Sequence, residues 1–280
     1  MKILVVGATG VLGRQVTPRL RERGHEVRVV VRKTEQADKF RRLGVEAVLG
    51  DILDAASLRT AVTGCDVALH LATAIPKPGG TQDWALNDRI RREGTRHLLA
   101  ACQEAGVRRY IQQSTAFLYE DRFPQLADET TPFLANPFLQ STTDMEELVK
   151  ASSLSWSILR GGLFYGPDTF EDGWRQAARQ GELPLPGDGS GRLSLIHVAD
   201  MARTVVIAAE EAPARSIYNV VDDQPVTYRE LFEYLAVVEG GPAPAAGGPV
   251  FLPSFACRND RLKATLGWSP AYPTYRSGLA

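Results

Sequence analysis

A run of seven residues near the start of the chain, Gly7-Ala8-Thr9-Gly10-Val11-Leu12-Gly13, restricts the possible folds more than any other feature. It stands directly between the apolar run 3–6 and an amphipathic stretch, 11–23, that ends before Gly24. Three glycines at this spacing allow a tight turn, close approach of the backbone to a pyrophosphate, and close packing of a helix on a strand. The sequence therefore predicts a strand–turn–helix unit that binds a dinucleotide phosphate at the helix N-terminus.

Apolar runs and amphipathic stretches alternate through the first part of the chain. The pattern predicts strands at 3–6, 27–31, 45–49, 67–71, 110–113 and 156–159, and helices at 11–23, 35–43, 55–62, 86–105 and 140–151. Such alternation is typical of a parallel sheet covered by helices on both faces. The expected fold class is α/β, a Rossmann doubly wound parallel sheet with a small C-terminal substrate lobe.

The second half of the chain is less regular. Strands are expected at 193–196 and 217–221 with a helix at 200–211 between them, whereas 181–191 is expected to be loop and 240–249 a mobile surface loop or linker. We therefore predict a dinucleotide-binding domain at 1–160, to which 193–221 return. The substrate lobe would consist of 161–192 and 222–280.

Composition limits the classes of partner and site. The net charge is −1 and no long basic run occurs, so we expect no nucleic-acid or membrane partner, only a small-molecule substrate. No apolar run reaches the length of a membrane span, and the N-terminus lacks a secretory signal pattern. The three cysteines, Cys65, Cys102 and Cys257, lie far apart. They predict reduced, buried thiols in a cytoplasmic protein without a metal site, and the oligomeric state stays open.

The residues after the second predicted strand bear on cofactor choice. An NAD-specific site usually presents Asp or Glu to the ribose 2′-hydroxyl there, but this chain has Arg32-Lys33. An arginine can pair with a 2′-phosphate in a fork, whereas a carboxylate would repel it. We therefore predict NADP(H) in preference to NAD(H). The alternative is that the two basic residues simply form a solvated turn.

Further candidate cofactor residues follow the third, fourth and fifth strands. Asp51 could accept from the adenine amino group, with Ile52 beside it, although Asp51 could instead cap the next helix, a task open to Asp54 or Ser57 as well. The cofactor would also pass Leu71, Ala72, Thr73 and Ser114. His70 is expected to be a packed strand-end residue rather than a catalyst.

These motifs, together with several others in the same order, resemble the short-chain dehydrogenase/reductase superfamily. The matching segments after the glycine loop are Gly50-Asp51, His70-Leu71-Ala72, Ser114-Thr115 with Tyr119, Leu159-Arg160, Tyr165-Gly166-Pro167, His197-Val198-Ala199-Asp200, Tyr218-Asn219-Val220 and Leu266-Gly267-Trp268-Ser269-Pro270. The resemblance is to the extended branch of sugar-nucleotide epimerases, dehydratases and reductases, and it covers most of the chain.

The resemblance implies a Ser or Thr, a Tyr and a Lys as the reacting side chains. Thr115 matches the hydroxyl position, where it would orient the substrate oxygen. Phe138 and Thr142 stand where the tyrosine and lysine are expected, and no Tyr-x-x-x-Lys occurs in the chain. Because neither residue can supply a proton, the usual epimerase mechanism does not carry over, and the chain is an atypical member. Arg192 also lies one residue further from His197 than the family's sugar-diphosphate arginine usually does.

Other residues are weaker candidates. Tyr119 and Tyr165 match positions that are largely structural in the family, and His197 with Asp200 is expected to cap and pack a helix. Glu171-Asp172 is expected to be a solvated helix start. Some of the following four aromatic residues are expected to line an apolar pocket: Trp84, Phe117, Phe164 and Trp174.

Three functions are consistent with this sequence. The leading hypothesis is an NADPH-dependent ketoreductase of atypical type that reduces a bulky, polyketide-like ketone, whether aromatic or not, with the substrate itself assisting protonation. The second is a non-catalytic NADP(H)-sensing or scaffold protein. The third is a lyase or isomerase that retains the dinucleotide as structure.

Overall fold

The computed structural model describes residues 1–76, 83–250 and 252–279, and the chain divides into two compact units. The first unit comprises Met1–Ser114, Ala135–Leu159 and Ala202–Ile217, and the second comprises Thr115–Leu134, Arg160–Met201 and Tyr218–Ala280. Relative to the predicted domains, residues 115–134, 160, 193–201 and 218–221 group with the second unit rather than the first.

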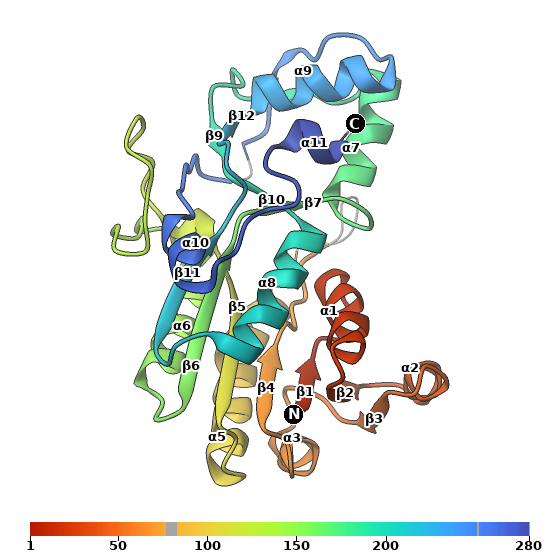
Figure 1. Ribbon diagram of the computed structural model, residues 1–280. Helices are drawn as coiled ribbons and strands as arrows, with labels where there is room; N and C mark the ends of the chain where they lie inside the picture. Colours follow the sequence, from red (N-terminus) through yellow and green to blue (C-terminus); the bar gives the residue numbers. More distant parts are fainter. Residues whose placement is uncertain (77–82, 251, 280) are drawn as a thin grey trace. The chain divides into compact units, whose positions relative to one another are not determined.

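A seven-stranded sheet forms the centre of the first unit (Figure 1). Its strands are β1 (Lys2–Val6), β2 (Glu26–Val31), β3 (Glu46–Leu49), β4 (Val67–His70), β5 (Arg109–Thr115), β6 (Ser155–Gly161) and β11 (Ser216–Val220). Their order is β11-β6-β5-β4-β1-β2-β3, and β1, β2, β3, β4 and β5 pair in parallel. The predicted Rossmann fold class is confirmed. The strand order reverses between β1 and β4, and ligands of such sheets bind at the carboxyl ends of the strands at that point.

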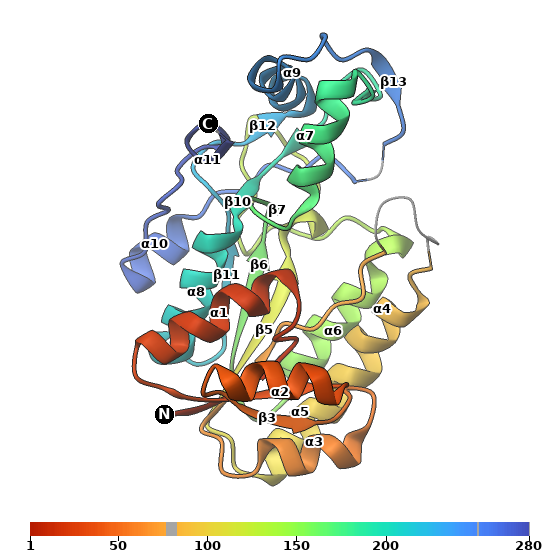
Figure 2. The same ribbon diagram turned by 90° about the vertical axis from the view of Figure 1, so that its right-hand side faces the viewer.

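The helices of the first unit follow the predicted stretches closely. They are α1 (Val11–Glu22), α2 (Thr34–Arg42), α3 (Ala55–Val62), α4 (Ala85–Arg89), α5 (Thr95–Glu104), α6 (Gln140–Ala151) and α8 (Val198–Glu211). The single helix predicted at 86–105 is interrupted, because a π-helical turn, Ile90–Gly94, joins α4 to α5. Figures 1 and 2 show α3, α5 and α6 against one face of the sheet and α1 and α8 against the other.

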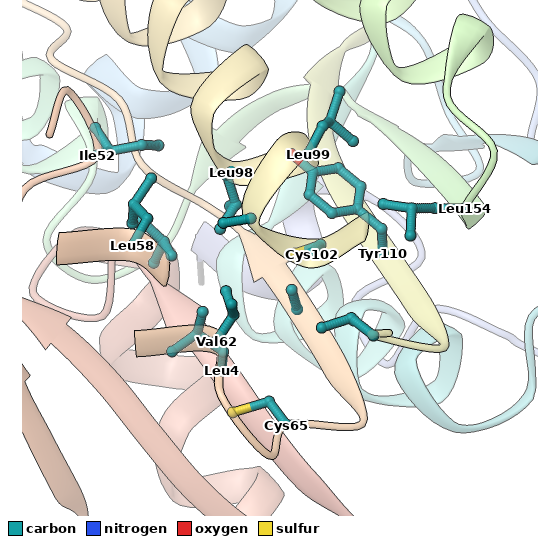
Figure 3. Close-up of a cluster of buried hydrophobic side chains, with 14 of the residues drawn as sticks. Leu4, Ile52, Leu58, Val62, Cys65, Leu98, Leu99, Cys102, Tyr110 and Leu154 are labelled. Carbon is teal, nitrogen blue, oxygen red and sulfur yellow. The ribbon is translucent and has the colours of Figure 1, made fainter. Parts of the chain in front are cut away.

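The core of the first unit lies between β4, β5 and the helices α3 and α5 (Figure 3). Leu4, Leu58, Leu98 and Tyr110 are fully buried in it. Cys65 and Cys102 are buried in the same cluster, and all three cysteines of the chain are free thiols, as their spacing suggested. Burial of this apolar surface is what holds the sheet and its helices together.

The second unit contains short paired strands and four helices. The strands are β7 (Leu163–Tyr165), β8 (Leu185–Pro186), β9 (Arg192–Leu193), β10 (Leu195–His197), β12 (Val226–Thr227) and β13 (Ala246–Gly248), and the helices are α7 (Phe170–Gln180), α9 (Tyr228–Glu239), α10 (Asp260–Leu266) and α11 (Tyr275–Leu279). The expectation that 181–191 and 240–249 are wholly loop was wrong, since β8 and β13 pair in parallel across these two stretches. Strands this short have no periodicity that a sequence can reveal.

Neither a membrane-spanning helix nor a metal-binding cluster is found among the described residues. Within residues 1–76, 83–250 and 252–279, no helix is at once long and apolar enough to cross a bilayer. In the same part of the chain, no group of three or more His, Cys, Asp or Glu residues is arranged to hold a metal ion.

Candidate dinucleotide site and active site

The turn after β1 requires glycine at two of its three glycine positions. Gly7 has φ +99°, and a Cβ added to it would lie 2.5 Å from the backbone nitrogen of Ala72, which follows β4. A Cβ added to Gly13 would lie 2.2 Å from the carbonyl oxygen of Gly7. Both approaches are closer than real Cβ atoms allow, so the protein's own packing demands glycine at these two positions.

Gly10 is different, because nothing in the protein demands a glycine there. Its φ is −77°, an ordinary value, and an added Cβ would find only the Gly7 carbonyl oxygen, at 3.4 Å. Gly10 is exposed and is the N-cap of α1, and among the described residues no side chain caps this helix. Gly10 therefore leaves open space in front of the N-terminus of α1, where the backbone N–H groups have no capping side chain. A pyrophosphate could approach there and accept hydrogen bonds from the N–H groups of the first turn.

Arg32 and Lys33 lie at the carboxyl end of β2, and both are exposed. Lys33 is the N-cap residue of α2. Neither side chain forms an ion pair with an acidic residue in the part of the chain that the structure describes. The two cations are therefore available at the strand end where the adenosine ribose of a dinucleotide is usually bound.

Asp51 lies in the turn between β3 and α3. Its Oδ1 accepts the Leu53 N–H at 2.9 Å, and its backbone N–H donates to Ser57 Oγ at 3.1 Å. Asp54 caps α3 by accepting the Ala56 N–H at 3.0 Å, so Asp51 is not the helix cap. Ile52, next to it, is buried against Gly94, at which an added Cβ would lie 2.9 Å from Ile52 Cγ1.

The segment after β4 runs past the glycine turn. The Leu71 N–H donates to the Val6 carbonyl at 2.8 Å, which extends the pairing of β1 and β4 by one residue. Leu71 is buried, Ala72 half-buried and Thr73 exposed, so the chain emerges at the carboxyl edge of the sheet. His70, one residue earlier, is 1% exposed, and burial lowers its pKa to about 4. It is therefore neutral at pH 7.

Ser114 ties the end of β5 to α6. Its Oγ donates to Glu146 Oε1 at 2.7 Å, and both side chains are buried. Lys150 Nζ lies 3.5 Å from the other carboxylate oxygen of Glu146. This buried hydrogen bond links the end of β5 directly to α6.

Phe138 and Thr142 lie just before α6 and in its first turns. Phe138 is 41% exposed and forms an edge-to-face pair with Trp84, with ring centroids 4.8 Å apart. Thr142 is 1% exposed, and its hydroxyl has no hydrogen-bond partner among the described residues. Together Trp84 and Phe138 present an apolar aromatic surface where the resemblance leads one to expect a tyrosine hydroxyl.

Thr115 belongs to the second unit, where it begins a 3₁₀ turn, Ala116–Leu118. Its side chain is 6% exposed, and its Oγ1 accepts the Phe117 N–H at 3.5 Å. That hydrogen bond is at the long limit, so the hydroxyl has donor capacity left for another acceptor.

Tyr119 and Tyr165, the two candidate tyrosines, lie in the second unit and are buried. Tyr119 is held between Arg160 Nη1 and Asn219 Oδ1, each 2.6 Å from its hydroxyl, and burial raises its pKa. Tyr165 donates to the Thr274 carbonyl at 3.2 Å, and burial raises its pKa too. Neither geometry is that of a tyrosine poised to release a proton.

His197 and Asp200 hold the C-terminal segment of the second unit. The His197 ring stacks on Tyr272 at 3.8 Å between centroids, and the Asp200 carboxylate accepts the N–H groups of Ala271 and Tyr272 at 3.0 and 2.9 Å. The interpretation of Glu171 as a solvated residue was wrong. Glu171 is 6% exposed and accepts the Gly166 N–H at 2.5 Å, which pins the loop before α7.

Sequence reasoning missed Arg91, a half-buried arginine in the π-helical turn. Its Nη1 donates to Ser141 Oγ at 3.1 Å, next to Thr142. A signal was present in the sequence. Arg91 is four residues after Asn87 and seven before Leu98, and both of these residues are buried. Residues at this spacing lie on one face of a helix, so the sequence places the Arg91 side chain on the inward face.

Comparison with known proteins identifies the family of the chain. Residues 7–212 match the model of an NAD(P)H-binding family. The chain is 34% identical to a 3-diazoavenalumate denitrifying reductase of a Streptomyces species, across 100% of this chain and 99% of that protein. It is 30% identical to the 4-hydroxy-2-methyl-3-oxo-4-farnesyl-3,4-dihydroquinoline-1-oxide ketoreductase of Stigmatella aurantiaca, across 86% of this chain and 74% of that one.

Solved structures show the same fold. The dTDP-glucose 4,6-dehydratase of Streptomyces venezuelae has a TM-score of 0.87 at 23% identity, with 100% of this chain and 95% of that one covered. The UDP-glucose 4-epimerase of Thermus thermophilus, in complex with NAD, has a TM-score of 0.83 at 25% identity, with 100% and 96% covered. The chain thus belongs to the NAD(P)H-binding family and is an oxidoreductase of the short-chain dehydrogenase/reductase type.

Proposed function

We propose that the protein is an NADPH-dependent ketoreductase of atypical type, acting on a bulky aromatic ketone of the polyketide kind. The observation that carries the proposal is a glycine turn that fits a dinucleotide, combined with Phe138 and Thr142 where a proton-donating pair would stand. The edge-to-face pair of Trp84 and Phe138 supports an aromatic substrate, since ring faces favour further ring contacts.

Each part of the site has a chemical task in this proposal. Bound NADPH would supply the hydride. The amides of residues 10–13 would hold the pyrophosphate, Arg32 and Lys33 would hold the 2′-phosphate, and Asp51 would accept from the adenine. Thr115 donates a hydrogen bond that orients the carbonyl oxygen. Holding the reactants in a near-attack geometry can contribute more to the rate than the missing general acid would, which is worth about 10²–10⁴-fold.

Substrate-assisted protonation gives a direct test. A hydroxy-ketone, such as one with a phenol beside the carbonyl, should be reduced faster than its O-methylated analogue by about tenfold or more, because only the former carries its own proton donor. The measurement is NADPH consumption at saturating cofactor for the matched pair. Equal rates would mean that the protein supplies the proton, and Tyr119 and Tyr165 would be the first residues to replace.

Cofactor preference depends on Arg32. The change Arg32→Asp should weaken NADPH binding by about 10–100-fold and leave NADH binding equal or tighter, because a carboxylate repels a 2′-phosphate and accepts from a 2′-hydroxyl. Fluorescence titration with both reduced cofactors measures this. Arg42→Asp, at the far end of α2, is a matched control that should alter neither affinity. Unchanged affinities in Arg32→Asp would show that Arg32 only faces solvent.

A second candidate is hydride transfer to a diazo-bearing aromatic carbon. It is favoured by the full-length likeness to a denitrifying reductase of a diazo compound. Hydride would bond to the ring carbon while the carbon–nitrogen bond breaks and its electron pair departs with dinitrogen, so the reacting carbon needs no proton. This fits a site without a tyrosine. Dinitrogen release matched to NADPH consumption with an aryl diazonium, and no turnover of ketones, would select it.

A further inference from the structure

We propose that Arg91 binds the substrate oxygen on which negative charge develops during reduction. The inference rests on the proposed function and deepens it, since it names the group that stabilises the oxyanion. The proposed function gives that oxyanion one side-chain donor, Thr115. Preorganised donors at such an oxygen are usually among the largest contributions to catalysis.

The position of Arg91 is set by two elements of the first unit. It lies in the π-helical turn Ile90–Gly94, which packs against α6, and Figure 2 shows α4 and α6 side by side. Its Nη1 donates to Ser141 Oγ at 3.1 Å, and Ser141 is 1% exposed. The guanidinium is thereby held against Ser141, the residue that precedes Thr142 in α6. Single π-helical turns inside α-helices are frequent at functional sites.

Arg91 forms no ion pair with a described residue, in contrast with the two neighbouring arginines. Arg89 pairs with Glu93 at 3.0 Å, and Arg92 pairs with Asp144 at 2.6 Å. Arg91 donates only to the neutral Ser141 hydroxyl, so most of its five N–H donors remain available in the described part of the chain.

Arg91 nevertheless stays protonated at neutral pH. Burial lowers its pKa to about 10; Asp88 raises that pKa, and Arg92 lowers it further. A half-buried cation without a carboxylate partner is costly to the folded protein and is stabilised when an anion binds. The site is therefore prepared for a negatively charged oxygen, and the guanidinium acts as a fixed donor rather than as an acid.

The step balances with Arg91 in this role. Hydride from NADPH bonds to the carbonyl carbon, the π pair of the C=O bond moves onto oxygen, and Arg91 donates hydrogen bonds to that oxygen without losing a proton. A proton from the neighbouring substrate hydroxyl or from water completes the alcohol, and NADP⁺ is left. Because Thr142 is neutral, Arg91 is the side chain proposed to supply positive charge near the substrate oxygen.

The first experiment compares Arg91→Gln, Arg91→Lys and Arg96→Gln, the last being an exposed arginine of α5 that serves as control. Removing an oxyanion donor should lower kcat by about 10²–10³. We therefore expect that loss in Arg91→Gln, a smaller loss in Arg91→Lys, and no change in Arg96→Gln. NADPH affinity should be the same in the wild type and in the three variants. A loss of NADPH affinity in Arg91→Gln that matches its loss of kcat would overturn the proposal, because Arg91 would then bind the cofactor.

The second experiment does not depend on turnover. 4-Nitrophenol is added to the NADP⁺ complex, and the pKa of the bound phenol is read from its phenolate absorbance as pH is varied. A fixed cation favours the phenolate, so the wild type and Arg96→Gln should lower that pKa below its value in water. Arg91→Gln should abolish the shift. Arg91→Lys should keep part of it, and a retained shift in that variant also shows that the substituted site is still folded.

The two experiments separate this inference from the proposed function. A phenol shift that depends on Arg91, with no ketone turnover, supports Arg91 as the anion-binding residue and rejects the ketoreductase. Ketone turnover that is insensitive to Arg91→Gln, with an unchanged phenol pKa, supports the ketoreductase and overturns the role of Arg91.

Discussion

Gly10→Val should abolish NADPH binding while the protein remains folded. The valine side chain would occupy the space before the first turn of α1, where a pyrophosphate must approach the amides. The free protein should tolerate the change, because Gly10 has an ordinary φ and an added Cβ meets nothing closer than 3.4 Å. We expect NADPH affinity to fall by about 10³-fold or more, equivalent to about 4 kcal/mol.

Two further glycine variants make this measurement decisive. Gly13→Val should unfold or strongly destabilise the protein, since its Cβ would lie 2.2 Å from the Gly7 carbonyl oxygen. Gly173→Val, within α7, has no atom within 4 Å of the added Cβ and should change neither folding nor binding. Calorimetric titration with NADPH, together with thermal melting, compares the three. Retained binding in Gly10→Val would place the pyrophosphate away from this turn.

Acid should destabilise the protein through His70. Burial holds its folded pKa at about 4, below the ordinary value of 6.5, so the unfolded chain binds the proton more readily than the folded one. The stabilisation is complete above pH 6.5 and is lost as pH falls toward 4. Each pKa unit corresponds to 1.36 kcal/mol, and the 2.5-unit difference therefore amounts to a loss of about 3 kcal/mol from this residue.

The contribution of His70 can be separated from that of the carboxylates by difference. Urea unfolding is measured from pH 7 to pH 4 for the wild type and for His70→Leu, which keeps an apolar side chain at the end of β4. The free energy of unfolding of the wild type, minus that of His70→Leu, should decrease by about 3 kcal/mol as pH falls from 7 to 4. Only the wild type has this histidine to protonate. Parallel curves would show that His70 does not titrate between these pH values.

Much of the first unit could be predicted because its signals are local. The glycines at 7, 10 and 13 and the apolar runs of β1 and β2 each need only their immediate neighbours to specify a turn or a strand. The preference of parallel βαβ units for right-handed crossovers then restricts how such strands can be connected. For this reason the fold class and the NAD(P)H-binding family could both be predicted from the sequence.

Tertiary contacts decided what those local signals do not contain. The pairing of β8 with β13 joins segments about sixty residues apart, and the burial of Glu171 depends on a backbone N–H in the preceding loop. Likewise, only the folded chain brings Arg91 to Ser141, fifty residues later in the sequence. The sequence by itself determined which residues can carry a charge and which can adopt the backbone conformation of a tight turn. Which of them lie together, and which charges stay without a partner among the described residues, depended on long-range packing, because burial and pairing belong to the whole fold and not to any one segment.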